Sequence, residues 1–278
     1  MRAVGRRASR QVPCSWALLP IAAGCLLVAF VVVGPAATPY DPGAPVGVPW
    51  TPAGGEHLLG TDVLGRDVLS RLMAGGRRLL MVAALAAACT CLVGTSAGLI
   101  AAGARPGVGY AVDLVADLLI AVPALLPALL LAAVLPGTGA VVAATVVSGA
   151  PLTARIVADA ATRTSACGYV RAARLRGERP AAILVREVLP SMSGLLAADF
   201  GLRFVTALQL LCALGVLGLA ADVPATGDWA VMLRENLPGA ALNPAALAAP
   251  AVLLTAVALA VAGAAHTVAR AGTGSGPR

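Results

Sequence analysis

Long apolar runs alternate with shorter polar segments along the whole chain. Each run is long enough to cross about 30 Å of hydrocarbon as a helix, because a helix rises about 1.5 Å per residue. The pattern predicts an all-α, polytopic membrane helix bundle with about six transmembrane helices. The predicted spans are residues 16–33, 79–103, 108–135, 137–158, 192–221 and 244–268.

Composition favours a membrane protein over a soluble domain. Of 278 residues, 59% are hydrophobic and 12% are charged, which is about half the charge content of an ordinary soluble domain. Lipid can solvate an apolar surface that water cannot. The net charge of +7 could also indicate nucleic-acid binding, but cationic loops on the cytoplasmic side explain it better. We therefore expect membrane lipid, and no nucleic acid, around this chain.

The arginines predict the topology. If the N-terminus is cytoplasmic, most of the arginines lie in cytoplasmic segments, as the positive-inside rule requires. The first apolar run exceeds the 7–15 residues of a signal-peptide core, so an uncleaved helix is favoured over a signal peptide. Both termini are then cytoplasmic, in a bacterial inner membrane. The arginines left outside are Arg66, Arg71, Arg77, Arg78 and Arg234.

This topology divides the chain into five segments. We expect a cytoplasmic tail at residues 1–15, a first transmembrane helix at 16–37 and an outer loop at 38–78. A five-helix core follows at 79–269, including a cytoplasmic loop at 159–190, and a cytoplasmic tail closes the chain at 270–278.

The cytoplasmic loop has the pattern of two short helices separated by a break. Gly177 suits the position after a helix end, where positive φ is needed, and Pro180 suits the start of a second helix. Leu189 and Pro190 are expected to end that helix before the fifth span. Such a helix pair offers a rigid projection for a cytoplasmic partner.

The same loop resembles the E-A-A-x₃-G-x₉-I-x-L-P motif of ABC importer permeases, and the phrase from Tyr169 to Arg174 is similar to the peptide/nickel branch. Three positions depart from the pattern: Arg171 replaces its Glu, Glu187 its Ile, and Arg176 the Leu usual in that branch. The positions that match in register are Ala172, Ala173, Gly177, Leu189 and Pro190.

The outer loop contains the most specific string in the chain. Residues 57–71 closely resemble the H-P-L-G-T-D-x-x-G-R-D-V-L-S-R signature of the dipeptide/oligopeptide/nickel import permeases, with Leu58 in place of the Pro. Its glycines allow tight turns, its aspartates can cap backbone donors, and residues 68–72 can start a helix along the membrane surface. The candidate positions are His57, Gly60, Thr61, Asp62, Gly65, Arg66 and Asp67.

The resemblance implies a permease subunit of an ABC importer for peptides, nickel chelates or similar small solutes. It implies three kinds of partner: ATP-binding subunits, a second homologous permease, and an extracytoplasmic solute-binding protein. Tyr169–Pro190 would be the element that couples to the ATPase. No G-x₄-G-K-[ST] phosphate loop is possible in a chain without Lys, so ATP would be used by the partner subunits. We expect no enzyme activity, no bound cofactor and no metal in this chain.

Polar residues inside the predicted spans are candidates for the transport path. Asp113 and Asp117 lie one helical turn apart near the cytoplasmic end of the third span, where a structural or solvated role is favoured. Asp199 and Arg203 have the i, i+4 spacing of an intrahelical ion pair. Pro123, with Pro127, predicts a kink that could free carbonyls for the path. The alternative function is a proton-coupled secondary transporter that uses Asp113 and Asp117.

Overall fold

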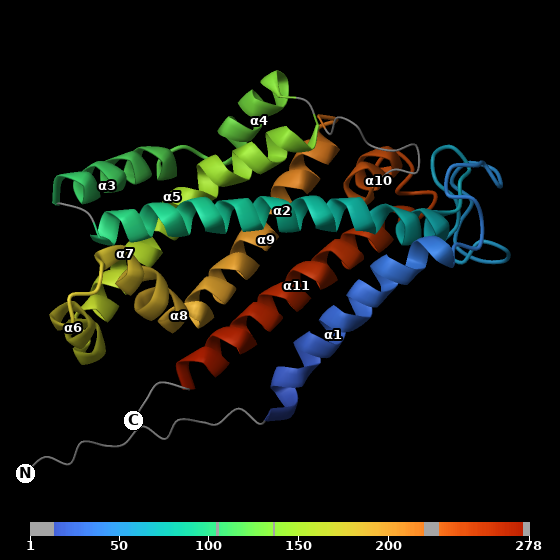
Figure 1. Ribbon diagram of the computed structural model, residues 1–278. Coiled ribbons are helices and arrows are strands. Elements are labelled where there is room, and N and C mark those ends of the chain that lie inside the picture. The colour runs from blue at the N-terminus through green and yellow to red at the C-terminus, as the bar shows by residue number, and fades with distance from the viewer. Residues whose placement is uncertain (1–13, 104–105, 136, 220–227, 275–278) are drawn as a thin grey trace, which may run out of the picture.

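The computed structural model describes residues 14–103, 106–135, 137–219 and 228–274, and within these ranges the chain is a helical bundle (Figure 1). The predicted all-α class is confirmed. The long helices are α1 (Cys14–Val33), α2 (Val68–Gly103), α5 (Thr138–Ser165), α9 (Ser193–Val216) and α11 (Pro244–Gly274). The shorter elements are η1 (Gly34–Ala36), α3 (Pro106–Ile120), α4 (Leu125–Val134), α6 (Gly168–Leu175), α7 (Pro180–Ile183), η2 (Leu184–Val188), α8 (Leu189–Ser191) and α10 (Trp229–Asn236).

Helix α2 begins earlier than the apolar pattern predicts. The expected surface helix at 68–72 does not stand apart from the second span, because the structure has one continuous helix of 36 residues. At Gly76 this helix packs closely on α10, because a Cβ added there would lie 2.2 Å from Cζ2 of Trp229. At about 1.5 Å per residue α2 is longer than the membrane is thick, so it extends beyond the hydrocarbon.

The third predicted span is broken. Helices α3 and α4 meet at a bend of 87° across residues 121–124, and Pro123 lies in this break. Pro127 lies in the first turn of α4, where its missing N–H removes no helical hydrogen bond. The predicted bend is therefore present, but it is a near-right angle between two helices and not a kink within one.

The number of spans depends on this bent pair. Within the described residues, four helices are long and apolar enough to cross a membrane, and the α3–α4 pair brings the number to five if it crosses as one broken span. Helix α1, with 20 residues, corresponds to the first of the six predicted runs. The chain is a multi-pass membrane protein.

The bundle packs around α2, which contacts α5 and α9 along its length. Gly94 and Gly98 make the α2–α5 contact possible: a Cβ on Gly94 would lie 2.5 Å from Cβ of Thr153, and one on Gly98 would lie 2.5 Å from the Ala154 carbonyl oxygen. Small residues at this spacing allow two helix backbones to approach closely in a membrane. The α1 and α11 helices lie side by side on the other flank of the bundle (Figure 1).

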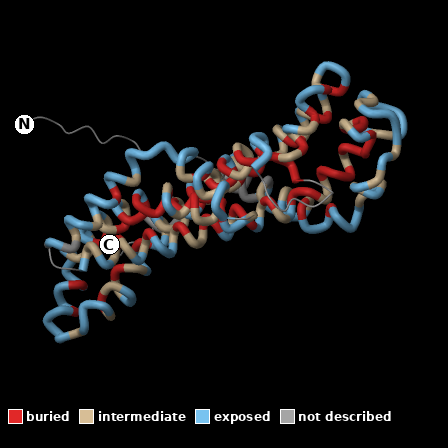
Figure 2. Tube along the Cα trace, turned by 90° about the horizontal axis from the view of Figure 1, so that it is seen from above, coloured by how far each residue is buried: buried red, intermediate tan, exposed pale blue. Residues whose placement is uncertain are grey.

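The surface of the bundle differs from that of a soluble protein. Buried positions run through the middle of the molecule, whereas the outward-facing positions are largely exposed (Figure 2). Many of the exposed side chains are large and apolar, such as Leu92, Leu130 and Leu259, which are 69%, 67% and 68% exposed. Apolar surface on this scale requires lipid or a neighbouring subunit to cover it.

Two structured segments lie at opposite ends of the bundle (Figure 1). One is the outer cap, which we define as residues 37–67, between η1 and α2. The other is the α6–α8 loop, which we define as residues 166–192, between α5 and α9. The long helices run between the two segments (Figure 1), and the assignment of one segment to each side of a membrane stays a prediction.

Candidate functional site

The α6–α8 loop is built as a helix, a sharp reversal and a second helical stretch. Helix α6 ends at Leu175 with Arg176 as its C-cap, and Gly177 follows with φ of +75°. The Gly177 N–H donates to the carbonyl of Arg174, and the Glu178 N–H donates to the carbonyl of Ala173. This pair of bonds is a Schellman cap, which explains why glycine is needed at this position. Pro180 then begins α7, as predicted.

A small apolar core holds the α6–α8 loop to the end of α5. Val170, Ala173, Ile183 and Val188 are buried there against Val157 and neighbouring residues of the bundle. The outward side of the loop is exposed: Leu175 at the tip is 91% exposed and Tyr169 is 44% exposed. Ala172 and Pro190 are exposed as well, so the motif residues divide between a buried anchoring side and an open side.

The end of the loop differs from the sequence prediction. Leu189 and Pro190 were expected to end the second helix, but they form α8, which continues from the π-helical turn η2. Pro190 lies in the first turn of α8, where its missing N–H is tolerated. Helix α8 ends at Ser191, and Met192 joins it to α9.

The outer cap is built of tight turns, several of which use positive φ. Gly60 and Gly65 have φ of +71° and +72°, so both predicted turns are present. A Cβ on Gly60 would lie 2.1 Å from the Thr51 carbonyl oxygen. The Thr61 hydroxyl donates to the Val48 carbonyl at 2.6 Å. Close backbone packing, and not regular strands, therefore shapes the cap.

Buried ion pairs join the outer cap to the bundle. The Asp62 carboxylate accepts from Nε of Arg66 at 2.8 Å and from Nη1 of Arg71. The same two arginines reach Glu235 of α10, at 3.1 Å and 2.8 Å. Asp62 and Arg71 are fully buried. Asn243 adds hydrogen bonds from its amide to the carbonyls of cap residues 59 and 61.

Asp67 starts α2 at the edge of the outer cap. Its Oδ2 accepts from the backbone N–H of Ser70 at 2.8 Å and from the Ser70 hydroxyl at 2.7 Å. Its Oδ1 lies 3.1 Å from Nδ1 of His57, whose ring packs against that of Tyr40. The predicted capping role of Asp67 is therefore present, and His57 is part of the cap's interior hydrogen bonding.

The predicted ion pair in the fifth span is present and deeply buried. Nε of Arg203 donates to Oδ1 of Asp199 at 3.2 Å, and both residues are more than nine-tenths buried. Oδ2 of Asp199 accepts from the Thr153 hydroxyl of α5 at 2.7 Å, and Sγ of Cys91 in α2 lies 3.6 Å away. The pair therefore links three helices inside the bundle.

The carboxylates of the third span are on the surface. Asp113 and Asp117 are both exposed on α3. Asp117 forms an ion pair with Arg155 of α5, which fits the structural role that the sequence favours. Pro123 lies in the bend that follows α3. These residues are not brought together with Asp199 and Arg203, which occupy the interior between α2, α5 and α9.

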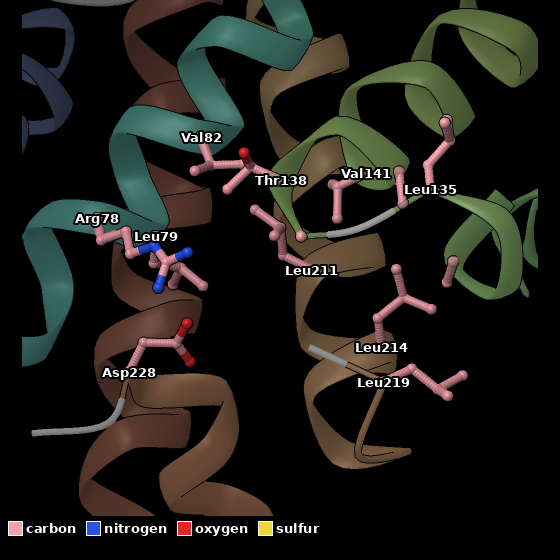
Figure 3. Close-up of a pocket in the computed structure, with 13 residues that line it drawn as sticks. Arg78, Leu79, Val82, Leu135, Thr138, Val141, Leu211, Leu214, Leu219 and Asp228 are labelled. Carbon is pink, nitrogen blue, oxygen red and sulfur yellow. The ribbon is translucent and has the colours of Figure 1, made fainter. Parts of the chain in front are cut away.

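A hollow that the sequence analysis missed lies at the cap end of the bundle, between α2, α4, α5 and α9 (Figure 3). Arg78 of α2 and Asp228 line it on one side, and leucines line it on the other. Oδ1 of Asp228 caps α10 by accepting the N–H groups of Ala230 and Val231. Burial raises the pKa of the Asp228 carboxyl, and the hydrogen bonds from the Val231 and Ala230 N–H groups, together with the charge of Arg78, partly oppose this. No sequence motif marked either residue.

The comparison with protein families decides the identity. Residues 94–271 match the model of the binding-protein-dependent transport system inner membrane component, which covers more than half of the chain. This chain belongs to that family of permeases.

Curated relatives agree with the family. The permease is 32% identical over 218 residues to the di/tripeptide transport system permease protein DppC of Pseudomonas aeruginosa (strain UCBPP-PA14), covering 76% of this chain and 72% of the relative. It is 31% identical over 202 residues to the oligopeptide transport system permease protein OppC of Bacillus subtilis (strain 168), and the match covers 72% of this chain and 66% of the relative. The glutathione transport system permease protein GsiD of Pectobacterium atrosepticum is 29% identical over 180 residues, and the match covers 64% of this chain and 60% of the relative.

A solved structure has a similar fold. One chain of the MetNI methionine ABC transporter, solved in inward-facing conformations, superimposes on this permease with a TM-score of 0.57. The match covers 74% of this chain and 96% of that chain at 18% sequence identity. At that identity the likeness concerns the fold alone, and it confirms the predicted permease-like bundle.

The function class follows from the family. This permease is the transmembrane subunit of an ATP-driven ABC importer, and the ATPase belongs to a separate subunit. The prediction that the chain is not itself an enzyme is therefore confirmed. The alternative of a proton-coupled carrier gains no support, and exposure of Asp113 and Asp117 on α3 gives it no enclosed proton site.

Proposed function

We propose that this permease forms one half of a translocation path for short peptides and couples it to ATP hydrolysis in a partner subunit. The cargo is proposed from the names of the relatives, which specify di- and tripeptides, oligopeptides and glutathione. Nickel chelates and similar small solutes stay a proposal from the outer-loop signature alone.

The α6–α8 loop carries the coupling role in this proposal. It is anchored by its own buried core, its reversal at Gly177 is fixed by a Schellman cap, and its tip exposes Leu175 and Tyr169. A projection that is rigid inside and apolar outside suits docking to another protein. We propose that an ATP-binding subunit binds this loop. The residues of the proposed coupling element are Tyr169, Ala172, Ala173, Gly177, Leu189 and Pro190.

The remaining partners are proposed on the same basis. A second, homologous permease would complete the path and cover part of the exposed apolar surface of the bundle. An extracytoplasmic solute-binding protein would deliver cargo on the side of the outer cap. ATP would bind to the partner subunits and not to this chain. We place the permease in the bacterial inner membrane with both termini in the cytoplasm.

Reconstitution tests this proposal. The permease would be incorporated into vesicles with the permease, ATPase and solute-binding subunits encoded beside it, and uptake of the labelled dipeptide alanyl-leucine would be measured. We expect uptake that requires ATP and stops when the ATPase subunit is omitted. Uptake at full rate without that subunit, or uptake driven by a proton gradient alone, would overturn the proposal.

A further inference from the structure

A buried carboxylate ties helix α9 to two neighbouring helices inside the bundle. Oδ2 of Asp199 accepts from the Thr153 hydroxyl of α5 at 2.7 Å, and Sγ of Cys91 in α2 lies 3.6 Å from the same oxygen. Oδ1 accepts from Nε of Arg203 at 3.2 Å. Among the described residues, the Thr153–Asp199 bond is the only hydrogen bond that joins a side chain of α5 to a side chain of α9.

The arginine of this cluster is packed against α5 and has little room to turn away. A Cβ added to Gly149, about one helical turn before Thr153, would lie 3.2 Å from Cδ of Arg203 and 2.8 Å from Cγ2 of Thr90. Arg203 is 4% exposed, and within the described residues its Nη2 has no hydrogen-bond partner. Asp199 therefore supplies the negative charge that Arg203 needs in an apolar span, and the pair holds the carboxylate in place for Thr153.

The Thr153–Asp199 bond lies between the two helices that carry the α6–α8 loop. Thr153 lies about three turns before the end of α5 at Ser165, and Asp199 lies about two turns after the start of α9 at Ser193. A force on the loop can move α5 and α9 together, or it can slide one helix along the other. Both helices are long and apolar enough to be spans, where no water replaces a broken hydrogen bond, so this bond opposes sliding.

From this geometry we propose that Thr153 and Asp199 are positioning residues for transport, because they make α5 and α9 move as one unit when the ATP-binding subunit displaces the α6–α8 loop. Arg203 contributes by holding the Asp199 carboxylate toward Thr153. Without the bond, part of the motion of the loop is lost as sliding of α5 along α9. The inference rests on the proposed coupling role of the loop and extends that role into the interior of the bundle.

The Thr153→Val variant tests this inference, because it keeps the shape of the side chain and removes the hydroxyl. ATP hydrolysis and alanyl-leucine uptake would be measured together in the reconstituted importer. We expect hydrolysis to continue near the wild-type rate, while the number of peptides carried per ATP falls about threefold to tenfold. Thr153→Ser, which keeps the hydroxyl, should keep the wild-type ratio.

Thr145 provides a matched control in the same helix. Thr145 is 2% exposed and Thr153 is fully buried, but the Thr145 hydroxyl donates to the Val141 carbonyl of its own helix at 2.8 Å. Thr145→Val therefore makes the same change in a buried side chain of α5 without removing a link to α9. We expect this control to carry the wild-type number of peptides per ATP.

A double substitution breaks the same link from the α9 side. Asp199→Leu combined with Arg203→Met removes both charges together, and apolar residues of similar size often replace a buried ion pair without loss of stability. We expect the double variant to bind the ATP-binding subunit and to lower the number of peptides per ATP by a factor similar to that of Thr153→Val. The double variant decides the test if Thr153→Val does not fold.

The outcomes separate this inference from the coupling role on which it rests. If uptake requires the ATPase subunit but Thr153→Val and the double variant keep the wild-type ratio, α5 and α9 do not need the bond and the inference is wrong. Equal falls in hydrolysis and uptake, or the same fall of the ratio in Thr145→Val, would also overturn it. If wild-type uptake proceeds without the ATPase subunit, the proposed coupling fails and the inference fails with it.

Discussion

The outer cap and the α6–α8 loop lie at opposite ends of one bundle and are held in opposite ways. The cap is fixed by buried charges: Asp62 and Arg71 are fully buried, and the network reaches Glu235 of α10. The loop is fixed by a few buried apolar side chains, and its ion pair between Arg176 and Glu178 is at the surface. Buried ionic contacts specify one arrangement, whereas an exposed loop keeps its surface available for a partner.

This difference matters for an alternating-access machine. The start of α2 and α10 are tied to the cap, so the outer end of the bundle is held as a unit. The other end of α2 reaches the α6–α8 loop through the core around Val157 and Ile183. In the proposed coupling, a push of the ATP-binding subunit on the loop would therefore reach packed helices.

The largest expected effect comes from breaking the cap's ion network. Asp62→Ala leaves Arg66 and Arg71 without their shared buried carboxylate, which should cost on the order of 3–5 kcal/mol in the free energy of unfolding. Unfolding in nanodiscs, followed by circular dichroism, measures this loss. The control is Asp41→Ala, because Asp41 is an exposed cap residue whose carboxylate accepts from the Gly43 N–H and forms no ion pair with another described residue. Equal melting temperatures for the two variants would contradict the role given to the network.

The next largest expected effect comes from replacing an apolar side chain at the tip of the α6–α8 loop, and it concerns binding of the ATP-binding subunit. Leu175→Asp should leave unfolding of the permease unchanged, since the side chain is 91% exposed. It should weaken binding of the ATP-binding subunit about tenfold or more, because a charge replaces an apolar contact at a proposed interface. Binding would be measured by biolayer interferometry on the nanodisc-embedded permease. Leu64→Asp, at a 57% exposed position of the cap, is the matched control and should bind normally.

Local chemistry made much of this structure predictable. Apolar runs locate helices because a membrane leaves few other options for the backbone. The turns at Gly60, Gly65 and Gly177 could be predicted because positive φ, which all three have, excludes most other residues. The Asp199–Arg203 pair followed from i, i+4 spacing alone.

The remaining features depend on contacts that are distant in the sequence. Helix α2 extends back to Val68 because Trp229 and the cap pack on its first turns, which an apolar scan does not detect. The π turn at Leu184–Val188, directly before α8, has no marker in the local sequence. Arg78 and Asp228 are 150 residues apart and approach only through the folding of α10 against α2.

The role of the α6–α8 loop is tested most directly by a Gly177→Val variant of the reconstituted importer, in which the coupling of ATP hydrolysis to peptide uptake is measured. A Cβ at Gly177 or at Gly168 would meet no atom within 4 Å, but only Gly177 has positive φ, so Gly168→Val is a matched control for bulk. ATP hydrolysis and alanyl-leucine uptake would be measured together. We predict that Gly177→Val lowers the number of peptides carried per ATP at least several-fold, whereas Gly168→Val keeps the wild-type ratio. An unchanged ratio in Gly177→Val would contradict the claim that the α6–α8 loop transmits the work of the ATPase.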